Sequence, residues 1–266
     1  MIATVWQSPW LALLFAVASW WLGTGVILWL VRRAQPTFGR SNLWLTALAL
    51  ASLVLAWHSM QAVGTAHAYL GFGAAMVMWA WHELMFLTGW LTGPRRQVQE
   101  RHAAGWRRWR QGVAAVAWHE VALVLNFAVL LVLQQGLPNH TALCTFAVLW
   151  CMRFSAKINL FMGVPQVGAQ FLPSHLVYLS SYFRSGSPSW FFYVSVGLAG
   201  ATLAWLIWQA QAAAIEVTPG WTLLATLLAL AIVEHVLMVV AAPVQRLWGW
   251  AMGRTPPLAV AKAEGG

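Results

Sequence analysis

The run WLALLFAVASWWLGTGVILWLV, residues 10–31, contains no charged residue. An α-helix needs about 20 consecutive apolar residues to cross the hydrocarbon core of a bilayer, so this run is long enough to span a membrane. Its nearest charges, Arg32 and Arg33, come after it, and no small-residue cleavage site follows. A secretory signal peptide has its charges first and a shorter apolar core. The run therefore predicts a permanent membrane span.

The remainder of the chain has the same character. The protein has 266 residues, of which 61% are hydrophobic and 8% are charged. So few charges could not cover the surface of a soluble domain of this length. A membrane barrel would need short segments of alternating polarity, whereas the apolar runs here have helical spanning length and end near Pro or Gly. We expect an all-α, polytopic membrane protein with about seven transmembrane helices at roughly 10–31, 42–63, 67–91, 113–134, 140–163, 190–213 and 220–243.

The expected domain organisation is simple. Residues 1–245 should form one seven-helix transmembrane domain, and residues 246–266 a short cytoplasmic tail. The segment 165–188 is amphipathic and rich in aromatic residues, which is typical of a segment that lies on the membrane surface.

Basic residues are distributed unevenly over the loops between the expected spans. Thirteen of the fifteen Lys and Arg residues fall in loops on one side of the membrane, and none falls in loops on the other side. By the positive-inside rule, this distribution predicts a periplasmic N-terminus and a cytoplasmic C-terminus. Six of the thirteen form a cytoplasmic basic loop after the third span: Arg95, Arg96, Arg101, Arg107, Arg108 and Arg110.

The basic loop is mainly an orientation signal. Its tryptophans, Trp106 and Trp109, suit the membrane interface, and the neighbouring arginines suit anionic lipid headgroups. Alternating basic and aromatic residues also occur in proteins that bind single-stranded nucleic acid. A short loop between two spans accounts for the same residues, so we expect membrane lipids and no nucleic acid as partners.

Ionisable residues inside the expected spans form the candidate site, because each is costly in lipid unless it is paired or faces a cavity. They come from the third, fourth, fifth and seventh spans and lie at a similar depth, roughly 9–17 Å from the cytoplasmic end at 1.5 Å per residue. Their charges nearly balance, which predicts a packed network. The members of this polar layer are His82, Glu83, His119, Glu120, Arg153, Lys157, Asn159, Glu234 and His235.

Several interpretations of the polar layer stay open. It could be a structural ion network, or a metal site, since His and Glu are suitable ligands. The second His of the zincin motif and the Glu-x-x-His of di-iron bundles are both missing. A metal site thus stays open without a motif that would identify the metal, which is unknown. A third interpretation is axial ligation of a macrocycle by His119 or His235, the candidate pigment ligands, because Ala115 and Ala231 precede them by one turn. A proton or solute pathway is the fourth.

No serine or cysteine nucleophile has a neighbouring base, and no phosphate-cradling glycine loop is present. We therefore assign no catalytic residue and expect a protein that is not an enzyme, with a membrane metalloenzyme or a transporter of pigment or its precursors as alternatives.

Six segments together resemble the PuhE proteins, a family of photosynthetic complex assembly proteins of purple and related bacteria. The resemblance covers about residues 18–240, including every member of the polar layer. The chain departs from the family pattern in two expected cytoplasmic loops, residues 31–36 and 165–170. The segments are ASWWLGTGVILWL (18–30), WAWHELMFLTGWLTGPRR (79–96), WHEVAL (118–123), LWCMRFSAKINLFMGV (149–164), QFLPSHLVYLSSYFR (170–184) and EHVLMVV (234–240).

The resemblance implies a process more firmly than a mechanism. That family is encoded beside the reaction-centre H subunit and is implicated in building the reaction centre and in adjusting bacteriochlorophyll production. It implies a multi-pass protein of the bacterial inner (intracytoplasmic, photosynthetic) membrane, with reaction-centre subunits or other assembly proteins as partners. It also implies bacteriochlorophyll or a precursor, bound transiently, as the cofactor to test for.

Overall fold

The computed structural model describes residues 5–252. Seven of its α-helices are long and apolar enough to cross a membrane, so the predicted all-α architecture with seven candidate spans is confirmed. These helices are α2 (Pro9–Val31), α3 (Phe38–Met60), α4 (Thr65–Leu87), α5 (Gly105–Gln134), α6 (Thr141–Met162), α7 (Trp190–Ala212) and α8 (Thr218–Val236). The short elements are the 3₁₀-helices η1 (Gln35–Thr37), η2 (Ala169–Phe171), η3 (Ser174–Tyr182) and η4 (Val244–Trp248), and the single turn α9 (Gly249–Met252).

Several helix boundaries differ from the expected spans; α3, for example, begins at Phe38 rather than near residue 42. Helix α5 begins at Gly105 rather than near residue 113, because Trp, Arg and Gln are compatible with a helix and Gly112 does not interrupt it. At 1.5 Å per residue its 30 residues measure about 45 Å, more than the roughly 30 Å hydrocarbon core of a bilayer. Helices α4 and α8 end earlier than expected, at Leu87 and Val236.

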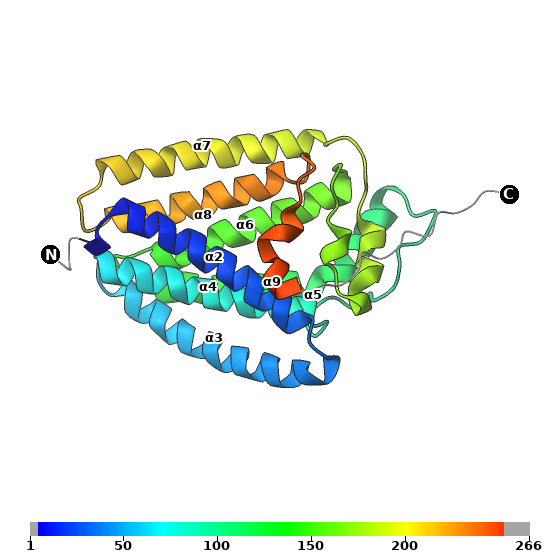
Figure 1. Ribbon diagram of the computed structural model, residues 1–266, viewed down its shortest axis with the longest axis horizontal. Coiled ribbons are helices and arrows are strands. Elements are labelled where there is room, and N and C mark those ends of the chain that lie inside the picture. Colours follow the sequence, from blue (N-terminus) through cyan, green and yellow to red (C-terminus); the bar gives the residue numbers. More distant parts are fainter. Residues whose placement is uncertain (1–4, 253–266) are drawn as a thin grey trace.

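The long helices form one bundle in which consecutive helices run in opposite directions (Figure 1). The segments that follow α2, α4, α6 and α8 consequently lie at one end of the bundle, and those that follow α3, α5 and α7 lie at the other. Every described arginine outside α6 belongs to the first end, which we call the basic end. The described loops at the opposite end, residues 61–64, 135–140 and 213–217, contain no Lys or Arg.

Helix α4 lies at the centre of the bundle and contacts α2, α3, α6 and α8. Small residues on α4, such as Gly71 and Ala75, let the neighbouring helices approach closely, as is usual between membrane helices. Phe72 of α4 packs with Leu223 and Leu227 of α8. The outer faces of α5 and α7 instead expose large apolar side chains, which suits contact with lipid.

Two segments without α-helix pack together at the basic end, residues 88–104 and 163–189, and we call this pair the cap. Tyr182 joins them: its hydroxyl donates to the Gln97 carbonyl at 2.9 Å and accepts from Arg95 Nε at 2.9 Å. Leu176 and Leu179 are buried with Phe86 of α4. Segment 165–188 contains the 3₁₀-helices η2 and η3 and packs on α4, and its expected position on the membrane surface stays a prediction.

The chain after α8 returns to α2. Trp248 and Ala251 are buried against Leu28 of α2, and Trp21 Nε1 of α2 donates to the Leu247 carbonyl at 2.8 Å. Residues 246–252 of the expected cytoplasmic tail are therefore packed on the bundle. The rest of that tail, residues 253–266, lies outside the described residues.

Candidate functional site

Helix α6 has polar side chains on two opposite faces. Each helical residue turns the chain by about 100°, so residues four apart share a face and residues two apart point in nearly opposite directions. Arg153 and Lys157 form a cationic row, and Ser155 and Asn159 form a neutral row on the other side. Helix α6 can therefore bond to neighbours on both sides at once.

The cationic row forms two ion pairs. Arg153 Nη2 lies 2.7 Å from Glu83 Oε2 of α4, and Lys157 Nζ lies 2.5 Å from Glu120 Oε1 of α5. The Glu120 and Lys157 side chains are each 20% exposed, whereas Arg153 is 39% exposed. Helix α6 is thereby joined to α4 and α5 by charge-assisted hydrogen bonds, the stronger class of hydrogen bond in proteins.

The neutral row connects α6 to α7 and α8. Asn159 Nδ2 donates to Ser155 Oγ at 3.4 Å and to Ser195 Oγ of α7 at 3.3 Å. His235 of α8 places Nδ1 2.9 Å from the Ala231 carbonyl, so Nδ1 carries the proton and Nε2 accepts from the Ser155 hydroxyl at 3.0 Å. Both ring nitrogens of His235 are therefore engaged.

Glu234 has a different partner from the other two carboxylates. Its Oε1 accepts a hydrogen bond from Trp20 Nε1 of α2 at 2.8 Å, and its side chain lies at the exposed edge of the α2–α8 contact. Arg153 is near enough to Glu234 for electrostatic attraction, although Arg153 forms its ion pair with Glu83. Glu234 thus attaches α2 to the layer through an indole rather than through a cation.

The two imidazoles between α4 and α5 are only partly satisfied. His82 Nε2 accepts from Asn126 Nδ2 at 3.0 Å, while His82 Nδ1 has no protein partner. His119 is fully buried, and neither of its ring nitrogens has a hydrogen-bond partner among the described residues. Its ring lies 4.6 Å from that of Phe86 and 6.3 Å from that of His82.

The cap segment 88–104 lies directly beside His119. The backbone N–H of His119 donates to the Thr92 carbonyl at 3.0 Å, and Arg95 N donates to the Ala114 carbonyl at 3.2 Å. Gly93 is required here, because a Cβ at this position would overlap the Ala114 carbonyl and the Ala115 backbone. Non-helical backbone at this depth is tolerated in membranes only where protein encloses it.

This packing limits what His119 and His235 can ligate. The space beside Ala115, where a flat macrocycle would lie, is occupied by Gly93. His235 is 2% exposed and uses both nitrogens. Ligation of a tetrapyrrole magnesium by either histidine would require the surrounding elements to separate, so the pigment hypothesis stays a prediction that needs such a rearrangement.

The layer also lacks the grouping that a metal ion needs. Within residues 5–252, no three His, Cys, Asp or Glu side chains lie close enough together to hold a metal. The carboxylates are separated by their partners: Glu83 lies against Arg153, Glu120 against Lys157, and Glu234 against Trp20. The arrangement that results cross-links five helices around α6 by ion pairs and hydrogen bonds.

Several partners in the layer were not identified from the sequence. Asn126 and Ser155 are uncharged polar residues within the expected spans, a signal that could have identified them as buried hydrogen-bonding groups. Trp20 and Trp150, whose indoles lie against Glu234 and Glu120, are two of 20 tryptophans, so nothing in the sequence distinguished them.

The basic loop needs a correction. Arg107, Arg108 and Arg110 lie in the first turns of α5 rather than in a loop. Trp106 and Trp109 stack with ring centroids 4.7 Å apart on this exposed end of the helix. The other members of the set, Arg95, Arg96 and Arg101, lie in the cap segment 88–104.

The chain is similar to known proteins over nearly its whole length. The family described as "Protein of unknown function (DUF3623)" matches residues 6–258. An uncharacterized 30.4 kDa protein in the puhA 5′ region of Rhodobacter capsulatus is 36% identical over 249 residues, which cover 92% of this chain and 91% of that protein. No solved structure matches the chain. The family match includes all seven long helices, the cap and η4.

Proposed function

The chain belongs to the DUF3623 family, and from this premise we propose that it is an inner-membrane protein that assists assembly of the bacterial photosynthetic reaction centre. The observation that carries the proposal is the relative encoded in the puhA 5′ region, which is 36% identical over nearly the whole chain. The six segments that resemble the PuhE proteins support the same process, because that family is encoded beside the reaction-centre H subunit. We expect reaction-centre subunits or other assembly proteins as partners.

The geometry favours a scaffold over an enzyme. Ion pairs and hydrogen bonds join α6 to α4, α5, α7 and α8, and its two charged side chains, Arg153 and Lys157, are paired with carboxylates of α4 and α5. A bundle fixed in this way can present its lipid-facing helices to partner subunits in one arrangement. Any effect on bacteriochlorophyll production would then follow from the number of reaction centres assembled.

We propose the orientation that the charge distribution predicts, with the N-terminus periplasmic and the C-terminus cytoplasmic. It is supported by the position of the described arginines outside α6, all of which belong to the basic end. The proposed location is the inner membrane, including its intracytoplasmic, photosynthetic extensions.

Transient binding of bacteriochlorophyll or a precursor is the second candidate function. One observation favours it: both ring nitrogens of the buried His119 are without a protein hydrogen-bond partner among the described residues. A neutral imidazole of this kind can ligate magnesium if the cap segment around Gly93 moves away.

The test uses a phototrophic bacterium that carries this gene. Deletion should lower the amount of mature reaction centre per unit of membrane, with transcripts of the reaction-centre subunits unchanged. The wild-type gene should restore the amount, and so should the control variant Glu100→Gln, which alters only the ion pairs of Glu100 with Arg107 and Arg95 outside the polar layer. Unchanged reaction-centre levels and unchanged assembly rates in the deletion strain would refute the proposal.

An absorption spectrum separates the two candidate functions. Protein purified in mild detergent from the pigmented host should carry no stoichiometric tetrapyrrole if it is a scaffold. Stoichiometric pigment would favour the second candidate, and the spectrum would identify the macrocycle.

A further inference from the structure

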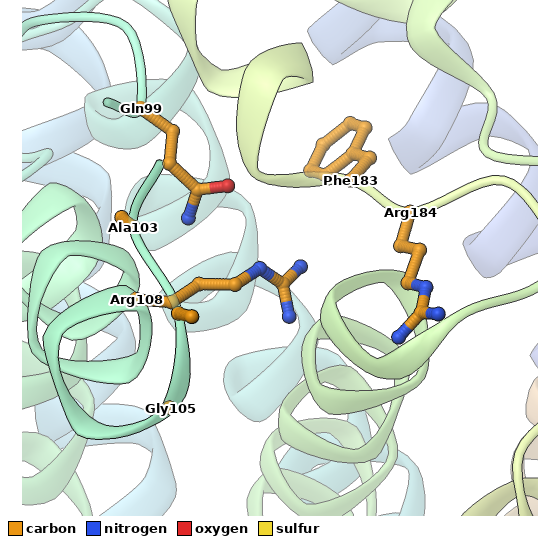
Figure 2. Close-up of a pocket in the computed structure, with 7 residues that line it drawn as sticks. Gln99, Ala103, Gly105, Arg108, Phe183 and Arg184 are labelled. Carbon is orange, nitrogen blue, oxygen red and sulfur yellow. The ribbon is translucent and has the colours of Figure 1, made fainter. Parts of the chain in front are cut away.

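A hollow of about 490 Å³ lies at the basic end, between the start of α5 and the end of the second cap segment. Figure 2 shows Gln99 on one side of it, Arg108 below, and Phe183 and Arg184 across from them. The volume is within the roughly 300–1,000 Å³ that is usual for pockets that bind small organic groups. Its seven lining residues are Gln99, Ala103, Ala104, Gly105, Arg108, Phe183 and Arg184.

Two guanidinium groups face this hollow. Arg108 is held in place, because its Nη2 donates to the Phe161 carbonyl at 2.8 Å and its guanidinium lies 3.8 Å from the centre of the Phe161 ring. No hydrogen bond or ion pair of the Arg184 side chain occurs among the described residues, and the two arginines are close enough for their charges to repel each other. Such convergence of like charges is unfavourable unless an anion compensates it.

The protein supplies no such anion within the hollow. The lining residues, all of them described, include neither Asp nor Glu. The nearest acid in the sequence, Glu100, is already engaged by Arg107 at 2.6 Å and by Arg95 at 3.8 Å. Arg108 bonds to the Phe161 and Tyr182 carbonyls through Nη2 only. The positive charge of Arg184 and the other nitrogens of the Arg108 guanidinium are therefore available to a ligand.

Neutral donors complete the lining. The side-chain nitrogen of Gln99 is buried and has no protein partner. Helix α5 starts at Gly105 with no side-chain cap, so the amide groups of its first turn keep their hydrogen-bonding capacity. A helix N-terminus with free N–H groups favours anions, phosphate in particular.

We propose that this hollow binds the phosphate of an anionic phospholipid headgroup, held by Arg108, Arg184, the Gln99 amide and the first turn of α5. The membrane interface supplies this ligand, because Trp106 and Trp109 are exposed on the same turns of α5, and tryptophan prefers the headgroup region. The hollow is larger than a bare phosphate requires, which suits a headgroup that carries glycerol. This site does not depend on the proposed role in reaction-centre assembly.

The test uses the full chain, purified in a neutral detergent and stripped of lipid. Calorimetric titration with short-chain phosphatidylglycerol should show saturable binding, and short-chain phosphatidylcholine should bind at least tenfold more weakly. Arg184→Met keeps the aliphatic part of the side chain and removes its charge, so it should weaken phosphatidylglycerol binding about tenfold or more, as expected for losing a charge-assisted contact. The matched control Arg101→Met, an exposed arginine of the same cap outside the hollow, should stay within twofold.

Inorganic phosphate identifies the source of the ligand. If it competes only weakly, the lipid headgroup is the ligand; if it binds alone as tightly and depends equally on Arg184, the phosphate site stands with a soluble phosphate compound as its occupant. Equal binding by wild type and Arg184→Met would overturn the proposal, as would an equal loss in Arg101→Met, which would indicate diffuse attraction.

A second variant protects the test against misfolding. Gln99→Leu removes the buried, unpartnered amide and keeps the backbone bond from Gln99 N to Ser181 Oγ, so the fold should be retained. If Arg184→Met does not fold, Gln99→Leu should weaken phosphatidylglycerol binding severalfold at an unchanged thermal unfolding midpoint. Unchanged binding by a folded Gln99→Leu protein would then overturn the proposal.

Discussion

The ion pair between α5 and α6 gives the sharpest test of the polar layer. Glu120→Gln preserves the size of the side chain and removes the charge that lies 2.5 Å from Lys157 Nζ. The remaining close contact of that ammonium is the face of Phe86, whose ring centre is 5.5 Å away, since Glu83 is paired with Arg153. Lys157 would therefore be left as an uncompensated charge inside the bundle.

The expected magnitude follows from the burial of the pair. Breaking a buried ion pair on one side costs roughly 3–5 kcal/mol in measured proteins, because the orphaned charge keeps its desolvation penalty. Both side chains are 20% exposed, which favours the lower end, about 3 kcal/mol for Glu120→Gln. Lys157→Met in the same chain removes the orphaned charge, so the double variant should be no less stable than Glu120→Gln alone. The coupling energy should then be at least the loss that Lys157→Met causes alone, about 3 kcal/mol by the same reasoning.

The assay is reversible unfolding of the purified protein in mixed micelles with increasing sodium dodecyl sulfate, followed by circular dichroism. The control is Glu100→Gln, whose partner Arg107 lies at a similar distance of 2.6 Å but whose side chains are 42% and 66% exposed. Its expected effect is below about 1 kcal/mol. Losses that add within about 0.5 kcal/mol for Glu120→Gln and Lys157→Met would refute the interaction.

Three further predictions concern the cap, the buried imidazole and the topology. Gly93→Ala should lower the free energy of unfolding by about 2 kcal/mol or more, because its Cβ has no space. The control Gly197→Ala, at an open position of α7, should raise it by up to about 1 kcal/mol, and equal effects of the two variants in the same unfolding assay would contradict the close packing. His119→Leu should leave the ratio of mature reaction centre to this protein unchanged if the imidazole is structural, and should lower that ratio, together with co-purified pigment, if it ligates one. Reporter fusions at Gly136 should read periplasmic and fusions at Gly105 cytoplasmic, and a cytoplasmic signal at Gly136 would exclude the proposed orientation.

The sequence by itself determined the spans and the candidate layer, because both depend on local properties. A segment of about 20 apolar residues must form a helix in lipid, where each backbone polar group needs an internal partner. The same solvent makes Glu83, Glu120, Arg153 and Lys157 conspicuous, since a charge within such a segment needs compensation. Their proximity in depth could be counted along each helix from its end.

Only the tertiary structure decided which groups meet. Helices such as α2 and α7 are apolar on every side, so no amphipathic pattern marks the face that turns inward, and the rotation of each helix about its axis stays undetermined. That rotation pairs Glu234 with Trp20 instead of a cation. The position of the cap segment around Gly93 is likewise set by tertiary contact, since its backbone finds hydrogen-bond partners at Ala114 and His119 of α5. Lipid specifies that a segment crosses the membrane, whereas side-chain packing between helices specifies what each crossing segment touches.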